Sequence, residues 1–96
     1  MKQLNQDFFR AITDNNVEAA KFYIRLGADV NVKNNYGYTA LMYASWNGYT
    51  EIVKLLLATS VDVNVKDMAN QTALMIASWN GHTELVTLLK QHGARE

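Results

Sequence analysis

The feature that most constrains this chain is an internal repeat with a period of 33 residues. When the sequence is shifted by that length, residues 39–42 fall on the identical residues 72–75, and residues 44–48 fall on the identical residues 77–81. A third block, Asp-Val-Asn-Val-Lys, repeats at the same offset. A period of this size is typical of stacked repeat units, in which each unit buries its apolar face against its neighbours.

Each repeat carries the pattern of two short helices. In the second repeat, Leu41 and Ala44 share one face of the first helix, and the Thr39 hydroxyl is placed to cap its first turn. Thr50 is expected to cap the second helix in the same way. That helix is apolar nearly all round between residues 52 and 57, so it needs cover on several sides. Neighbouring repeats supply such cover.

The pattern therefore predicts an all-α fold with no sheet of any size. We expect helices over residues 6–14, 17–26, 39–47, 50–59, 73–80 and 83–92, with short hairpin loops at 30–38 and 63–71.

These residues resemble the ankyrin-repeat family over nearly the whole chain. The family motif, which runs from a hairpin glycine through two helices to Asp-Val-Asn, is represented here by Asn34, Gly37, Thr39, Leu41, Ala44, Gly48, Glu51, Ile52, Val53, Leu55, Leu56, Leu57, Asp62, Val63 and Asn64. The resemblance implies an ankyrin-repeat α-solenoid of stacked helix–turn–helix units with short β-hairpin loops. It implies one domain over residues 1–96, with repeats at about 4–33, 34–66 and 67–96.

Substitutions at the two ends indicate capping repeats. Arg10 stands where the second repeat has Tyr43, and Lys90 stands where it has Leu57, so each end presents a polar residue in place of an apolar one. Two departures from the family pattern concern the backbone. Asn70 replaces the hairpin glycine and is expected to adopt positive φ, and Ser60 replaces a glycine at a cost of about 1 kcal/mol if its φ is positive.

Charge and composition exclude several classes of function. Nine basic and nine acidic residues cancel and are scattered, so no surface is expected to bind nucleic acid or an anionic membrane. There is no cysteine, and no apolar run resembles a signal peptide or spans a bilayer. We expect an intracellular, cytoplasmic protein.

No constellation of residues points to catalysis or to a cofactor. His82 matches the family's turn histidine and is expected to bond locally, and His92 lies near the end of the last helix, where a cation suits the helix dipole. The two histidines lack neighbouring ligands at metal-binding spacing. We therefore expect no enzyme activity, no metal and no cofactor.

The aromatic residues point to a binding surface. In ankyrin repeats partners dock on the hairpin tips and first helices, and the corresponding positions here are Asn35, Tyr36, Tyr38, Trp46, Asn47, Met68, Gln71, Trp79 and Asn80. Tryptophan and tyrosine are enriched in binding hot spots, so exposed Trp46 and Trp79 are predicted to form one patch with the two tyrosines. The other reading is that a tryptophan repeated with its neighbours is inherited by duplication and only packs. Tyr43 and Tyr49 are interpreted as packing or turn residues.

The predicted function is recognition of another protein through the concave face and the hairpin tips. A structural role is the alternative: the aromatic concave face pairs with itself in a weak homo-oligomer, or the chain is an engineered or minimal ankyrin scaffold with no dedicated ligand.

Overall fold

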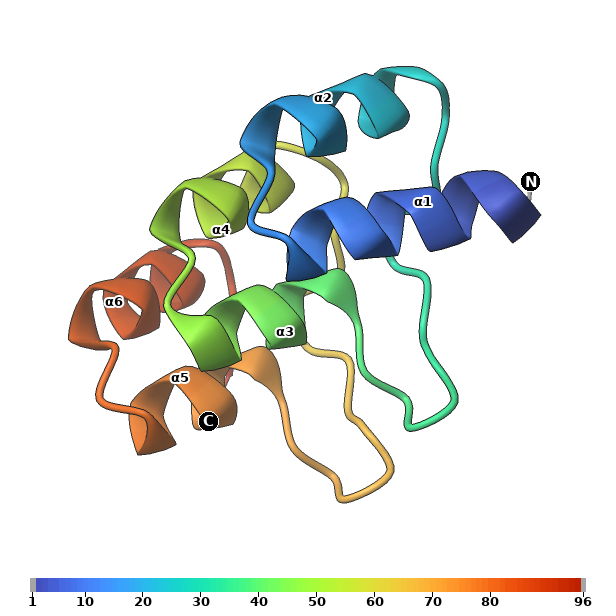
Figure 1. The fold of residues 1–96 in the computed structure, drawn as a ribbon. Coiled ribbons are helices and arrows are strands. Elements are labelled where there is room, and N and C mark those ends of the chain that lie inside the picture. Colours follow the sequence, from blue (N-terminus) through green and yellow to red (C-terminus); the bar gives the residue numbers. More distant parts are fainter. Residues whose placement is uncertain (1, 96) are drawn as a thin grey trace.

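The computed structural model describes residues 2–95 and contains six helices within them (Figure 1). Met1 and Glu96, which the predicted domain 1–96 includes, lie outside the described residues. The helices are α1 (Lys2–Thr13), α2 (Val17–Arg25), α3 (Ala40–Asn47), α4 (Thr50–Leu57), α5 (Ala73–Trp79) and α6 (Thr83–Gln91).

The helices form three antiparallel pairs that stack side by side. In Figure 1, α1, α3 and α5 make one row, and α2, α4 and α6 make a second row behind it. Each helix packs against its partner in the pair and against the equivalent helix of the next pair. The long loops after α2 and α4 project to the same side of the stack, so each repeat is L-shaped (Figure 1).

The loops are hairpin-shaped but carry almost no β-structure. Within residues 2–95 the only β-bridge joins Lys33 to Thr39, and no strand forms. An Asx turn shapes each loop instead. The Asn34 side chain accepts the N–H groups of Tyr36 and Tyr38, at 2.9 and 3.0 Å. In the second loop the Asp67 side chain accepts the N–H groups of Ala69 and Gln71, both at 2.8 Å. Because the described residues form six helices and no strand, the predicted all-α class is confirmed.

Five of the six predicted helices agree with the structure to within about two residues at each end. The exception is α1, which begins at Lys2 rather than at residue 6. Nothing in residues 2–6 breaks a helix, and the Gln3 side chain donates to Asp7 one turn later, at 2.8 Å. These residues therefore continue the helix of the first repeat toward the N-terminus.

Threonine hydroxyls cap the two inner helices as predicted. Thr39 accepts the N–H of Met42, and Thr72 accepts that of Met75, both at 3.3 Å. The prediction that Thr50 caps α4 is wrong. Thr50 is the first residue of that helix, and its hydroxyl donates to the Gly48 carbonyl at 3.4 Å.

The core runs through all three repeats as one cluster. Its largest fully buried side chains are Phe8, Ile12, Leu41, Met42, Ile52, Leu56, Ile76, Leu85 and Leu89. Every helix except α2 contributes at least one of these large side chains, and the buried residue of α2 is the small Ala20. No pair of helices holds a core of its own, so stability depends on the interfaces between repeats.

The Asp-Val-Asn blocks join one repeat to the next through hydrogen bonds. Asp29 accepts the N–H of Asn31 two residues on, which turns the chain, at 2.9 Å. The Asn31 side chain then accepts the N–H of Asp62 in the following repeat, at 2.7 Å. Asn64 accepts the N–H of Arg95 in the same way, at 2.9 Å. The repeated block is thus explained by its role in setting the register of the stack.

The two departures from the family backbone pattern have different outcomes. Asn70 adopts positive φ of 62°, as predicted. Ser60 does not adopt positive φ, so the cost expected for it does not arise.

Candidate protein-binding surface

A groove of about 230 Å³ lies on α3, beside α5 and the first hairpin loop. It is lined by Tyr38, Met42, Tyr43, Trp46, Asn47 and Ile76, and we call it the Trp46 groove. The residues from α3 form two adjacent pairs one turn apart, Met42 with Tyr43 and Trp46 with Asn47, so they share one side of that helix. The helix begins at the Thr39 cap, which fixes where this face starts.

Buried side chains form the floor of the Trp46 groove, and aromatic rings form its walls. Met42 and Ile76 are almost fully buried, whereas Trp46 remains 53% exposed. Tyr43 is held by an edge-on contact with Phe9 of α1, with ring centroids 6.2 Å apart. An exposed indole beside a fixed apolar floor offers a docking place for an apolar side chain.

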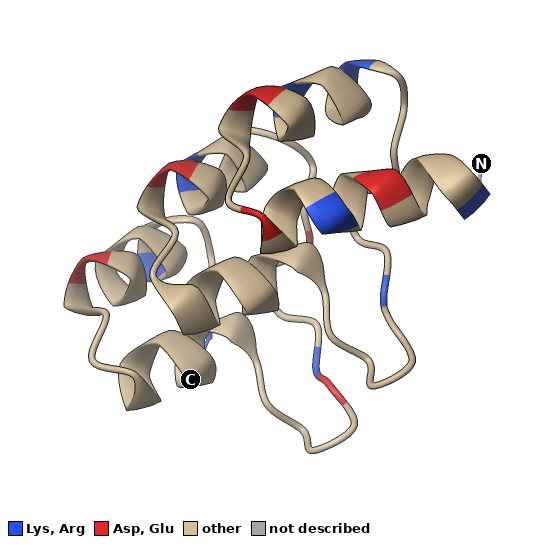
Figure 2. Cartoon of the chain, viewed as in Figure 1, with Lys and Arg blue, Asp and Glu red and all other residues tan. Residues whose placement is uncertain are grey.

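Neither α3 nor α5 contains a charged residue. Figure 2 shows this contrast clearly: both helices are tan throughout, whereas α1, α2, α4 and α6 each carry acidic and basic positions. The Trp46 groove therefore lies on an uncharged surface.

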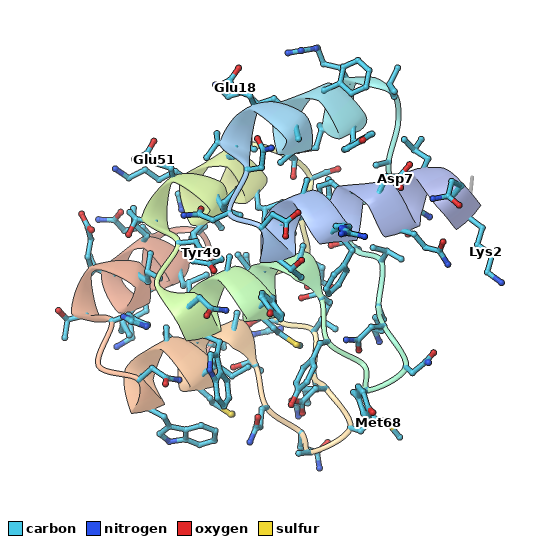
Figure 3. All side chains as sticks on the ribbon, viewed as in Figure 1. Lys2, Asp7, Glu18, Tyr49, Glu51 and Met68 are labelled. Atoms are coloured by element: carbon cyan, nitrogen blue, oxygen red, sulfur yellow. The ribbon has the colours of Figure 1, made fainter. Side chains whose placement is uncertain are left out.

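The hairpin tips extend this surface beyond the helices. Tyr36 is 67% exposed, and its ring centroid lies 6.4 Å from that of Tyr38, which reaches the Trp46 groove. The N–H of Met68 donates to the Tyr36 carbonyl at 3.4 Å, so the two tips lie side by side. Met68 is 78% exposed and lies at the end of the second hairpin (Figure 3). Asn35 is also exposed on the first tip.

The two predicted asparagines on the helices have a local structural role. The Asn47 side chain donates to the Tyr43 carbonyl at 3.0 Å, and the Asn80 side chain donates to the Ile76 carbonyl at 2.8 Å. These bonds satisfy carbonyl groups in the last turns of α3 and α5. Gln71 is half-buried, and its backbone N–H and carbonyl both bond to Asp67.

The two tryptophans are both exposed, as predicted, but they do not line the same groove. Trp79 is 65% exposed. It lines a separate depression on the last repeat, together with Leu74 and Val86. The single patch predicted from the repeat period is therefore divided, because Trp46 and Trp79 line two different depressions.

Sequence reasoning missed three residues that line the Trp46 groove: Met42, Tyr43 and Ile76. Tyr43 had been interpreted as a packing residue, and it packs on Phe9 while also facing the groove. The spacing of Met42 and Trp46 by four residues within α3 was a usable signal, because it places both on one side of the helix.

The histidines have structural surroundings. His82 does not bond locally as predicted: its Nε2 lies 3.1 Å from the Trp46 carbonyl oxygen in the preceding repeat. His92 follows the last residue of α6, and its Nδ1 lies 3.0 Å from the Leu88 carbonyl oxygen. Among residues 2–95, no three His, Asp or Glu side chains are grouped so that they could hold a metal ion. In the same part of the chain, no helix is long and apolar enough to cross a membrane.

Comparison with known proteins agrees with this architecture. The family model described as "Ankyrin repeats (3 copies)" matches residues 8–96. A search of curated proteins finds no match to the sequence. The family match covers most of the chain, and its three copies correspond to the three helix pairs. The chain therefore belongs to the ankyrin-repeat family, whose members are generally protein–protein interaction modules rather than enzymes.

Proposed function

We propose that this chain binds a partner protein through the Trp46 groove and the adjoining hairpin tips. The observation that carries the proposal is an uncharged groove with a buried apolar floor and an exposed indole wall. From the predicted set, Tyr38, Trp46 and Asn47 line the groove, and Asn35, Tyr36 and Met68 extend it along the tips. Gln71, Trp79 and Asn80 lie outside the groove lining and have a lesser role in this proposal.

The chemistry of the groove favours an apolar anchor on the partner. Tryptophan and tyrosine provide large rigid contact areas and lose little conformational entropy on docking. Water over an apolar floor is released when a side chain enters, which stabilises the complex. A leucine-like or aromatic side chain fits this environment, whereas a charged one would lose its hydration without gaining an opposite charge.

Self-association through the same aromatic face is the second candidate. Exposed Trp46, Tyr36 and Met68 together form the kind of surface that idle monomers seldom carry. Light scattering over a concentration series separates the candidates, because a monomer at every concentration leaves the groove available to another protein.

The deciding experiment compares capture of partners by the unaltered chain and by Trp46→Ala. Because Trp46 is half-exposed, the substitution should change the melting temperature little while weakening binding by roughly 1–4 kcal/mol. Trp79→Ala is the matched control, since Trp79 is similarly exposed but lines another depression. If Trp46→Ala lowers the melting temperature by several degrees and leaves binding intact, the indole is a packing group and the proposal fails.

A further inference from the structure

A second depression beside the Trp46 groove carries the charge that the groove lacks. It measures about 370 Å³ and lies between α1 and the first hairpin loop, and we call it the lysine cleft. Its polar lining residues are Lys2, Asn5, Gln6, Lys33, Asn34 and Asn35. Lys2, Asn5 and Phe9 stand at intervals of three and four positions, so α1 presents one face to the cleft.

The lysine cleft is positive, and its charges are not neutralised by neighbouring side chains. Neither Lys2 nor Lys33 forms an ion pair within residues 2–95, whereas Lys21 and Lys54 each pair with a glutamate three residues earlier. No acidic residue lines the cleft. Asp7 of α1 lines a different depression beside α2, and in Figure 3 the Lys2 side chain points away from α2.

Both walls of the cleft are fixed by backbone contacts. Lys33 forms the β-bridge with Thr39, which holds the start of the hairpin loop. On α1, the Asn5 side chain accepts the N–H of Asp29 at 2.8 Å. The Asp29 carboxylate itself accepts the N–H of Asn31, so it is occupied within its own turn. The two lysines therefore extend from fixed positions on two different elements.

The lysine cleft adjoins the Trp46 groove along two lines of contact. Phe9 lines the cleft, and its ring makes the edge-on contact with Tyr43, which lines the groove. In the loop, Asn34 lines the cleft and Tyr38 lines the groove. The N–H of Asn34 donates to the Tyr38 carbonyl at 2.9 Å, and the Asn34 side chain accepts the Tyr38 N–H at 3.0 Å. One polypeptide segment can therefore contact both depressions.

We propose that the lysine cleft binds an aspartate or glutamate side chain of the partner protein, close to the apolar residue that enters the Trp46 groove. The inference rests on the proposed function for the apolar residue and adds an acidic one. A carboxylate accepts charge-assisted hydrogen bonds from ammonium groups, and the amides of Gln6 and Asn35 are further donors in the lining. Charge complementarity thus selects an acidic segment.

Nucleic acid is a poorer occupant than an acidic protein segment. Its binding depends on several positive groups placed along a continuous phosphate backbone. The lysine cleft offers two, and the adjoining Trp46 groove lies on helices without any charge.

The ionic contact acts at short range. The chain has nine basic and nine acidic residues and so no net charge. Salt at physiological concentration also screens exposed charges beyond about 8 Å. The two lysines should therefore slow the dissociation of a docked segment more than they speed its arrival.

The first test identifies the chemistry that the full chain selects. A phage-displayed library of random dodecapeptides is selected against the unaltered chain, Lys33→Glu and Trp46→Ala. The unaltered chain should enrich peptides that combine an apolar residue with a nearby Asp or Glu. Lys33→Glu should remove the acidic preference and keep the apolar one, and Trp46→Ala should do the reverse. Selection of acidic peptides without an apolar residue would contradict the Trp46 groove and leave the lysine cleft intact.

The second test measures the contribution of the carboxylate. A selected peptide and its form with Gln or Asn in place of the acid are compared by fluorescence polarisation. Loss of the carboxylate should weaken binding to the unaltered chain roughly three- to tenfold, as expected for two exposed ion pairs. On Lys33→Glu the two peptides should bind within about twofold of each other. Lys2→Glu reverses the charge on the other wall and should act in the same direction.

Lys66→Glu is the matched control. Lys66 stands one period after Lys33, at the start of the second loop, and is exposed but does not line the cleft. The substitution makes the same change in total charge, so the carboxylate should keep its full effect on this variant.

Three results would overturn the proposal. The first is enrichment of apolar peptides with no acidic preference, which would leave the Trp46 groove as the whole site. The second is a loss of the carboxylate effect in Lys66→Glu as large as in Lys33→Glu, which would attribute it to total charge. The third is a single-stranded oligonucleotide that binds the unaltered chain more tightly than the acidic peptide and is lost in Lys33→Glu, which would make nucleic acid the occupant.

Discussion

Gly48 and Gly81 occupy the same position in successive repeats, and replacing each by alanine measures one contact between repeats. Both glycines have positive φ, 71° and 73°, so alanine is strained at either position, by roughly 1–2 kcal/mol. A Cβ at Gly81 meets no atom within 4 Å. A Cβ at Gly48 would lie 2.8 Å from His82 Cε1, so the imidazole must move.

Moving the imidazole breaks the hydrogen bond between His82 Nε2 and the Trp46 carbonyl, which is 3.1 Å long. A bond of this kind contributes about 0.5–1.5 kcal/mol. We therefore expect Gly48→Ala to lower the free energy of unfolding by about 1 kcal/mol more than Gly81→Ala does. The difference corresponds to roughly 4–8 °C in melting temperature for a domain of this size.

Urea unfolding followed by circular dichroism measures both variants, and the same pair is repeated in a His82→Ala background. In that background the difference between Gly48→Ala and Gly81→Ala should disappear, because no imidazole remains to be displaced. Equal costs in the unaltered background, or a difference that persists without the imidazole, would refute the argument that His82 links the second and third repeats.

Other substitutions test the core, the caps and the register of the stack. Leu56→Ala should lower the free energy of unfolding by roughly 2–5 kcal/mol in urea titrations, since Leu56 is fully buried between repeats. Thr39→Ala should cost about 1 kcal/mol through loss of the bond to the Met42 N–H, and Thr39→Ser should restore most of it. Asn31→Ala leaves the N–H of Asp62 without its partner, and hydrogen exchange at that amide should accelerate more than exchange elsewhere.

The fold could be predicted because each 33-residue unit has the same pattern of two helices and a loop. Identical blocks at a 33-residue offset imply equivalent structure, and the Thr39 and Thr72 caps behave alike for that reason. The same logic does not apply where a segment has no equivalent in the other repeats. Residues 2–6 are helical, whereas the residues one period later, 35–39, lie in a loop, so comparison between repeats could not predict the start of α1.

The candidate surface was only partly predictable. Exposure of Trp46 and Trp79 follows from their helical position, but their separation into two depressions depends on the side chains that pack around each indole. The floor of the Trp46 groove combines Met42 with Ile76 from the adjacent repeat. Such a contact joins residues 34 positions apart, so it depends on how two helices pack and cannot be read from one helix alone.

The uncharged character of α3 and α5 has a kinetic consequence. Long-range electrostatic steering accelerates encounter only where opposite charges face each other, and these helices offer none. Association at the Trp46 groove should then proceed at the unsteered rate, on the order of 10⁵–10⁶ M⁻¹s⁻¹, and should vary little with ionic strength. Partners that fit the groove well would be distinguished by how long they stay bound, because the rate of arrival is nearly the same for all of them.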